Sequence, residues 1–505
     1  MKKISFLLVM VSLLWMLPVR AQQQDKLLQT LKSELEYSFS ELKKRELPPY
    51  YMNLRASDSY NVTISSNFGA MRSSNEKRTR LLVPQIRLGS PELDNFKYST
   101  SGAMVNRRTG AVMGGSYLPL DDSAADAIRQ AIWVDVLNRY DFACFMYEKT
   151  KTQAAVSVED EDKSSCFSKS PVEKYYEEPI PVGLSSVDMD AWEKRLNEIS
   201  AAFRANSNLQ EGSATLTFNT LRTYFVNTEG SEIVQNRVTA RLMLSASLKA
   251  EDGMNLSLSQ DFFAYNPNDL PDNSIIIAAA KDMLQRLEKL EKAPVADPYT
   301  GPAILSGPAS GVFFHEIFGH RLEGHRLKTG GQTFKKMVGE QVLPESFQVY
   351  CDPTLSNYAG TDLNGHYLYD DEGVKARRVN NVVNGVLTEF LMNRVPLDGF
   401  PTSNGHGRTS DAGDPVSRQS NLIIETTQPH SEVELRKMLI EEAKKQGKEY
   451  GYYFKTVTSG FTYTGEGGSL NSFNVTPLEV YRVFVDGRPD QLVRGVDMIG
   501  TPLSM

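Results

Sequence analysis

The chain has 505 residues, of which 40% are hydrophobic and 23% are charged. This composition is that of ordinary globular protein and excludes a disordered or fibrous chain. The formal net charge of −7 argues against nucleic acid as a direct partner. Three cysteines are too few to build a disulfide framework. A chain of this length is expected to form about two to four domains.

The first 21 residues are typical of a bacterial export signal. Lys2 and Lys3 precede the apolar run ISFLLVMVSLLWMLP, and Ala21 ends a stretch suited to cleavage. The apolar run of about 15 residues is shorter than the roughly 20 that a membrane-spanning helix needs, so a membrane anchor is the weaker alternative. We therefore expect an exported protein, periplasmic or secreted, with no membrane anchor after cleavage of residues 1–21.

Residues 22–160 are predicted to form a first domain that mixes helices and strands. Apolar residues recur at spacings of three and four in 25–47 and 123–149, which predicts two amphipathic helices. Residues 50–86 contain short runs of alternating polarity, which is typical of strands.

Residues 161–297 are predicted to form a central α+β domain. Helices are expected at 187–206 and 273–292. Between them, two alternating runs flank the turn sequence TEGS at 228–231, which predicts a β-hairpin.

Residues 298–505 are predicted to form a mostly antiparallel β domain that carries the candidate metal-site helix described next. Two hairpins are expected to turn at the NG of 384–385 and the DG of 486–487. One further helix is expected at 431–446, where Ser431 and Glu434 have the spacing of a capping box. The predicted fold class is therefore α+β, with helices and strands mixed in the N-terminal domains.

The stretch GVFFHEIFGHRLEGH contains three of the six histidines. His315, Glu316 and His320 follow the order H-E-x-x-x-H, which supplies two imidazoles for zinc and a carboxylate to accept a proton from water. In a regular α-helix, positions i and i+5 differ by about 140°. A metal site therefore requires the helix to be bulged or broken here, and Gly319 makes such a distortion cheap. The alternative is an amphipathic helix whose histidines lie at a polar boundary.

Other polar residues are weaker candidates. Glu323 follows His320 by one turn and is a possible partner of that imidazole or a further ligand. Arg408 and Asn404, in the sequence NGHGR, are candidates for binding a substrate backbone or terminus, and the alternative is a plain glycine-rich loop. The acidic residues 370–372 either hold a catalytic loop or calcium, or form a solvated turn.

The segment GPASGVFFHEIFGHRLEGHRL resembles the zinc-peptidase signature of the TldD/PmbA family, also called modulators of DNA gyrase. The later segments VYCDPTL, YDDEGVKARR, NGVLTEFLMNR and VRGVDMIGTPLS resemble further blocks of that family, in the same order, over 299–505. The resemblance implies a metallopeptidase acting on peptides or unfolded segments. It also implies about one zinc ion per chain, and a homodimer or a heterodimer with a TldE/PmbA-like subunit. By this resemblance His315 and His320 are zinc ligands and Glu316 is the general base.

The sequence departs from the family pattern at the third ligand. Family members usually take it from a cysteine near the C-terminus, and no cysteine follows Cys351 in this sequence. We expect that another residue completes the site, that metal binding is weak, or that the chain is truncated at Met505. The candidates for another ligand are Glu323, His325, His366, His406 and Cys351. The alternative function is a non-catalytic TldE/PmbA-like partner or scaffold that has lost its third ligand.

Overall fold

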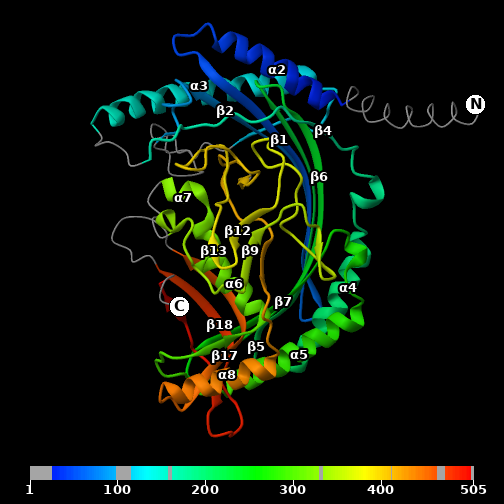
Figure 1. Ribbon diagram of the computed structural model, residues 1–505. Coiled ribbons are helices and arrows are strands. Elements are labelled where there is room, and N and C mark those ends of the chain that lie inside the picture. The colour runs from blue at the N-terminus through cyan, green and yellow to red at the C-terminus, as the bar shows by residue number, and fades with distance from the viewer. Residues whose placement is uncertain are drawn as a thin grey trace, which may run out of the picture.

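A curved seven-stranded sheet forms the N-terminal part of the protein, with helices on its outer side and the C-terminal domain on its concave side (Figure 1). The computed structural model describes residues 25–97, 115–156, 162–328, 334–410, 412–462 and 472–501. The predicted export signal lies outside these residues. Within the described ranges, no helix combines the length and apolar character needed to cross a membrane. The predicted α+β fold class is confirmed.

The large sheet has the strand order β3-β2-β1-β5-β6-β4, and β7 also pairs with β6. All of its pairings are antiparallel except that of β4 with β6. Its strands are β1 (Pro49–Asn67), β2 (Ala70–Leu88), β3 (Ser116–Tyr117), β4 (Lys174–Tyr176), β5 (Leu209–Asn227), β6 (Glu232–Lys249) and β7 (Asn255–Ala264).

Two long hairpins make up the centre of this sheet. Where the sequence predicted short strands in 50–86, the structure has two strands of 19 residues each, β1 and β2. They join at Phe68 and Gly69, whose φ angles of 48° and 74° are left-handed. The predicted hairpin at 228–231 is confirmed as the turn between β5 and β6. Because β1 pairs with β5 from Asn53 opposite Asn227 to Asn67 opposite Ser213, one sheet crosses the predicted boundary between 160 and 161.

The four helices predicted in this part are present as α2 (Lys26–Leu42), α3 (Ala125–Val156), α4 (Met189–Ala201) and α5 (Asn273–Glu291). Short 3-10 turns occur at η1 (Val182–Leu184), η2 (Ala202–Ala205) and η3 (Pro267–Asp269). The apolar stripes of α2 and α3 cover one end of the sheet, and those of α4 and α5 cover the other. Full burial of each large apolar side chain stabilises the fold by about 1.5–3 kcal/mol.

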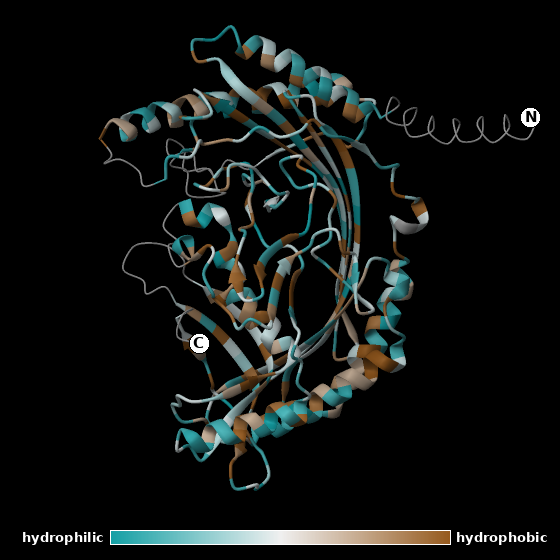
Figure 2. Cartoon of the chain, viewed as in Figure 1, coloured by the Kyte–Doolittle hydropathy of each residue, from teal (hydrophilic) through white to brown (hydrophobic). Residues whose placement is uncertain are grey.

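The C-terminal domain contains two main antiparallel sheets around the helix α6 (Gly307–Ile317). One has the order β13-β12-β9-β16, and the other has the order β19-β18-β17-β8 with β20 beside β18. Among the described pairings between named strands of this domain, only that of β8 with β17 is parallel. Hydrophobic residues concentrate in the elements around α6, whereas α8 is largely hydrophilic (Figure 2).

The strands of this domain are β8 (Ala303–Leu305), β9 (Phe347–Cys351), β10 (Asn357–Tyr358), β11 (Thr361–Asp362), β12 (Val379–Val383), β13 (Val386–Leu387), β14 (Gly407–Arg408), β15 (Val416–Ser417), β16 (Leu422–Thr426), β17 (Tyr450–Thr462), β18 (Phe473–Phe484), β19 (Gln491–Val493) and β20 (Met498–Gly500). Its other helical elements are η4 (Gly319–Leu322), α7 (Gly324–Lys328), η5 (Lys335–Met337) and α8 (Glu432–Lys445).

The turn and cap predictions for this domain are confirmed. Asn384 and Gly385 both have positive φ, at 48° and 76°, as a tight hairpin turn requires. The predicted turn at 486–487 connects β18 to β19. Ser431 and Glu434 form both hydrogen bonds of the capping box at the start of α8.

A buried ion pair joins the C-terminal domain to the sheet. Arg394 is fully buried and donates from both terminal nitrogens to Glu229, over 2.7 and 2.8 Å. Glu229 lies in the turn between β5 and β6, and Arg394 also donates to the carbonyl of Ser168. A bidentate pair of this kind fixes the two parts in one geometry.

Candidate metal centre

The helix that carries the histidine motif ends in the middle of that motif. The Ser306 side chain caps the start of α6, which ends at Ile317, and the 3-10 turn η4 follows. Phe318 connects the two with φ −117° and ψ −55°. The buried guanidinium of Arg321 donates to the last carbonyls, those of Glu316 (2.8 Å) and Ile317 (3.0 Å). The break between the two histidines that a metal site requires is therefore present.

The break brings the two imidazoles together around one carboxylate. The rings of His315 and His320 lie 4.6 Å apart, centroid to centroid. His315 Nε2 is 3.9 Å from Glu316 Oε1, and His320 Nε2 is 3.7 Å from Glu316 Oε2. One ligand atom from each residue lies within 4.8 Å of the other two. We call these three residues the histidine cluster.

Burial and charge in the histidine cluster suit a cation. The side chain of Glu316 is only 8% exposed, and its Oε2 accepts no hydrogen bond from a described residue. Burial raises the pKa of Glu316. Burial and the neighbouring His320 lower the pKa of His315 to about 4, so this imidazole is neutral at pH 7, the form that binds metal. His315 is 48% exposed, so the cluster is open to solvent on that side.

Glu323 orients His320 rather than joining the cluster. Its Oε1 lies 3.0 Å from His320 Nδ1, which leaves Nε2 facing Glu316. Arg326 and Arg418 contact its other oxygen. Burial opposes ionisation of Glu323, but the hydrogen bond with His320 and these arginines lower its pKa to about 2. These contacts favour the expectation that Glu323 is a partner of the imidazole over the expectation that it is a ligand.

The other candidates for a third ligand are engaged elsewhere. His366 Nδ1 lies 2.9 Å from the carbonyl of Pro353, and His406 Nε2 lies 3.1 Å from Ser420 Oγ. Cys351 is fully buried in β9, and burial raises the pKa of its thiol to about 12. His325 forms a hydrogen bond with the backbone of Ser417, and burial lowers its pKa to about 4. Among the described residues, the only group of potential ligands that lies close enough to share an ion is the histidine cluster.

Two residues that the sequence analysis missed pack against the cluster. A Cβ at Gly319 would overlap the side-chain amide of Gln419, which donates to the carbonyl of His315. A Cβ at Gly460 in β17 would lie 2.5 Å from Glu316 Cγ. A glycine inside a strand signals such a close approach, so the alternating polarity of the residues around Gly460 could have indicated it. The sequence around Gln419 carries no comparable signal.

Arg408 and Asn404, the predicted substrate-binding residues, have different surroundings. Arg408 lines a cavity, ion-paired to Asp371 over 3.0 Å. Asn404 is buried, and its amide bonds the backbone of Met392 and Phe390, each over 2.8 Å. These bonds hold the loop at Asn404, and substrate binding by either residue stays a prediction.

Comparison with known proteins identifies the C-terminal domain. Residues 298–505 match the family model described as the PmbA/TldA metallopeptidase C-terminal domain. The chain is 23% identical to a protein named Metalloprotease TldD homolog from Buchnera aphidicola, over 54% of this chain and 57% of that protein. The structure of TldE from Thermococcus kodakarensis has the same fold, with a TM-score of 0.60 at 14% identity, over 94% of this chain and 92% of that one. The C-terminal domain, residues 298–505, belongs to the TldD/PmbA family.

A second relative is also named a metalloprotease. Metalloprotease MJ0996 from Methanocaldococcus jannaschii is 26% identical over 56% of this chain and 57% of its own length. The chain thus spans little more than half the length of these two relatives. The matched family model contains the whole histidine cluster, together with Gln419 and Gly460.

Proposed function

We propose that this TldD/PmbA-family chain is a zinc-dependent peptidase that hydrolyses peptides or unfolded polypeptide segments. The observation that carries the proposal is the buried carboxylate of Glu316 between two imidazoles at a solvent-open site. The names of the two metalloprotease relatives support a metallopeptidase-like function. The histidine cluster fits a metal ion because two ring nitrogens and a carboxylate oxygen without a hydrogen-bond partner face one another.

His315 and His320 would hold one zinc ion through their ring nitrogens. When bound, zinc supplies Lewis-acid activation of water and of the scissile carbonyl. Glu316 would accept the proton of the attacking water at Oε2 and pass it to the leaving amine. Because burial raises its pKa, this carboxylate is a better base than an exposed one. Glu323 would keep His320 oriented throughout.

The edge of β17 offers a place for an extended peptide. β8 pairs only with residues 452–454 of β17, which continues to Thr462. Gly460 places this part of the strand directly against Glu316. A peptide that adds a strand there would use main-chain hydrogen bonds and so accept many sequences.

We also propose that the protein is exported and acts in a dimer. The basic and apolar start of the sequence supports export to the periplasm or beyond. The fold shared with TldE supports a homodimer or a heterodimer with a TldE/PmbA-like subunit. The H-E-x-x-x-H motif supports assignment to the TldD-like branch.

The competing proposal is a non-catalytic partner or scaffold. It is favoured by one observation: apart from Glu316, the described residues bring no further protein ligand to His315 and His320.

Zinc content per chain separates the two proposals. We expect about one zinc per purified chain, measured by elemental analysis, and loss of that zinc in His320→Ala. His430→Ala is the matched control, because His430 is exposed and lies outside the cluster. Absence of zinc from the unsubstituted protein after metal is supplied would contradict the peptidase proposal and favour the scaffold.

A further inference from the structure

A cavity of about 390 Å³ lies between the concave face of the large sheet and the C-terminal domain. On its floor, the lining residues of β1, β2 and β5 alternate along each strand, and Gln235 and Arg237 of β6 lie opposite those of β5, so these side chains share one face of the sheet. The other wall comes from residues 366–368, Asp371 and residues 408–410. Among the described lining residues, none belongs to α6 or η4, which carry the histidine cluster.

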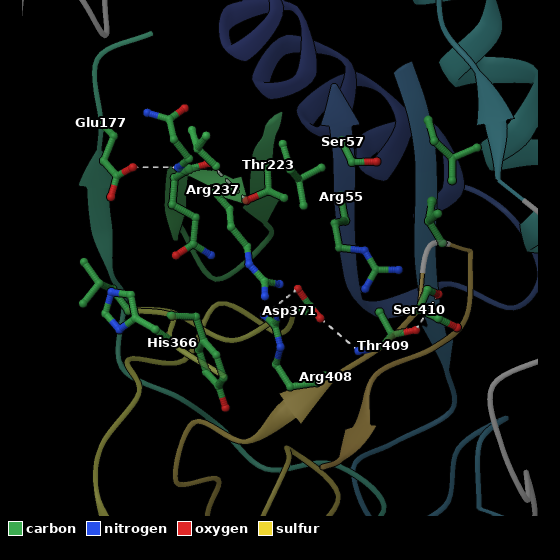
Figure 3. A pocket seen from close by; sticks show the side chains of 18 of the residues that line it. Arg55, Ser57, Glu177, Thr223, Arg237, His366, Asp371, Arg408, Thr409 and Ser410 are labelled. Carbon is green, nitrogen blue, oxygen red and sulfur yellow. Dashed lines mark hydrogen bonds and ion pairs between the residues drawn. The ribbon is translucent and has the colours of Figure 1, made fainter. Parts of the chain in front are cut away.

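Three arginines from distant parts of the sequence line this cavity. Arg55 comes from β1, Arg237 from β6 and Arg408 from β14. Figure 3 shows the side chains of Arg55 and Arg237 extending from the sheet toward the space beside Asp371 and Arg408. In register, Ser57 and Thr223 are paired on the floor, one step along the same face from Arg55. Their hydroxyls add hydrogen-bonding groups between the arginines.

The carboxylate nearest to these arginines is already engaged. Asp371 Oδ1 accepts from Arg408 over 3.0 Å, and its Oδ2 accepts from the backbone N–H of Thr409 over 2.9 Å. Arg237 donates to the backbone carbonyl and the side-chain oxygen of Asn364, which are neutral acceptors. Arg55 donates to the carbonyl of Gly413 over 2.9 Å.

The second carboxylate of the cavity is also hydrogen-bonded. Glu177 accepts from the backbone N–H of Asn236 over 2.6 Å and from the hydroxyl of Tyr175 over 2.8 Å. Among the described lining residues, three guanidinium groups therefore face two carboxylates, both of which accept other hydrogen bonds, and Asp414 lies near Arg55 outside the lining. Burial lowers the pKa of Arg55 and of Arg237. Asp371 and Asp414 raise the pKa of Arg55 in part, and the charge of Arg408 lowers the pKa of both arginines. An added anion would offset this crowding of positive charge.

We propose that this cavity binds an oxyanion group, a carboxylate or a phosphate, between Arg55, Arg237 and Arg408. The planar guanidinium presents paired donors that match both groups, which a lysine would not. Leu81, Val83 and Leu221 on the floor would contact the apolar part of the ligand. The volume is that of a site for a small molecule or the end of a peptide. The site stands apart from the histidine cluster, so it does not depend on the proposed peptidase activity.

Calorimetric titration of the full chain with inorganic phosphate and with succinate tests the proposal at fixed ionic strength. We expect saturable binding of at least one probe, and an increase in its Kd of about tenfold or more in Arg237→Gln. Arg241→Gln is the matched control. Arg241 lies on the same strand, pairs with Asp261 over 3.5 Å and is not a lining residue. Tighter binding of phosphate would assign a phosphate ligand, and tighter binding of succinate would assign a carboxylate ligand.

A second variant tests the charge argument without removing an arginine. Thr223→Asp places a tethered carboxylate on the cavity floor, where it would compete with a bound anion. We expect it to abolish binding of the probe and to raise Tm. The proposal is wrong if neither probe binds, if Arg237→Gln and Arg241→Gln bind equally well, or if Thr223→Asp lowers Tm and still binds.

Discussion

His315, Glu316 and His320 come from one short stretch of the chain, whereas Arg55, Arg237 and Arg408 come from three strands spread over most of the described sequence. The histidine cluster takes its geometry from the end of a single helix and one 3-10 turn. The cavity lined by the three arginines exists only when the C-terminal domain packs against the sheet. The histidine cluster should therefore tolerate loosening between the C-terminal domain and the sheet. The cavity lined by the three arginines should be lost when these two parts loosen.

Replacement of Glu316 should have the largest effect on catalysis. In Glu316→Gln the proton acceptor is removed while the size of the side chain is kept, so kcat for a reporter peptide should fall by about 10²–10⁴-fold. Zinc content should remain close to that of the unsubstituted protein, because the two imidazoles are retained. Full activity would remove Glu316 from the mechanism, and loss of zinc equal to that of His320→Ala would make it a ligand.

Replacement of Arg394 should separate the two sites. Arg394→Met leaves Glu229 without its bidentate partner, which should lower the free energy of unfolding by about 3–5 kcal/mol. Under native conditions oxyanion binding should weaken while zinc content is retained. Arg488→Met is the control, since the ion pairs of Arg488 are exposed and Met can still contact the Phe484 ring on which its guanidinium lies. This variant should change stability by less than about 1 kcal/mol. Equal weakening of both sites would contradict the contrast between them.

The acidic turn beside the cavity should make stability depend on pH. Burial raises the pKa of Asp370 to about 7 and that of Glu372 to about 8. Both lie among buried charges: Asp371 adjoins Asp370, and Arg394 and Arg87 face Glu372. The native state therefore holds more protons than the unfolded state from about pH 4 to pH 8.

The contribution of Asp370 and Glu372 to the free energy of unfolding should therefore be greatest at about pH 4 and should fall as pH rises to 8. Urea titrations of Glu372→Gln should show a shallower decline, because one of the two titrating groups is gone and the amide still accepts from Arg394 N–H. An unchanged pH profile would show that Glu372 titrates normally.

The smallest effect should come from Gly460. In Gly460→Ala the new methyl group would press on Glu316, and kcat/KM should fall by about tenfold, about 1.4 kcal/mol, with little change in Tm. Gly311→Ala in α6 is the matched control, because a Cβ there meets no atom within 4 Å. Equal activity of the two variants would show that Glu316 moves aside without cost.

Short sequence patterns predicted most of the helices and turns of this protein. The helices, the three hairpin turns and the capping box follow from short-range patterns. The i to i+5 spacing of the histidines showed that a metal site would need a break in the helix between them. The family relationship came from motifs within 299–505. The length of β1 and β2 was missed because their polar alternate residues resemble loop sequence until both strands are paired.

Features that depend on long-range pairing could not be predicted. Nothing in the composition near 160 indicates that β1 pairs with β5 across that position. The arginines of the cavity are ordinary polar residues of amphipathic strands until the sheet register and the seating of β14 place them together. The approach of Gln419 to Gly319 likewise depends on tertiary contact.

The pairing of β1 with β5 also constrains how the chain reaches its native state. The β1–β2 and β5–β6 hairpins join neighbours and can form early, but each β1–β5 contact must wait until the chain has been made to Ser213 and beyond. Until then, one edge of β1 has no partner strand. An exposed edge of this kind templates association between chains. We expect nascent or truncated chains that end before β5 to aggregate, so this edge is where the chain most needs help from a chaperone.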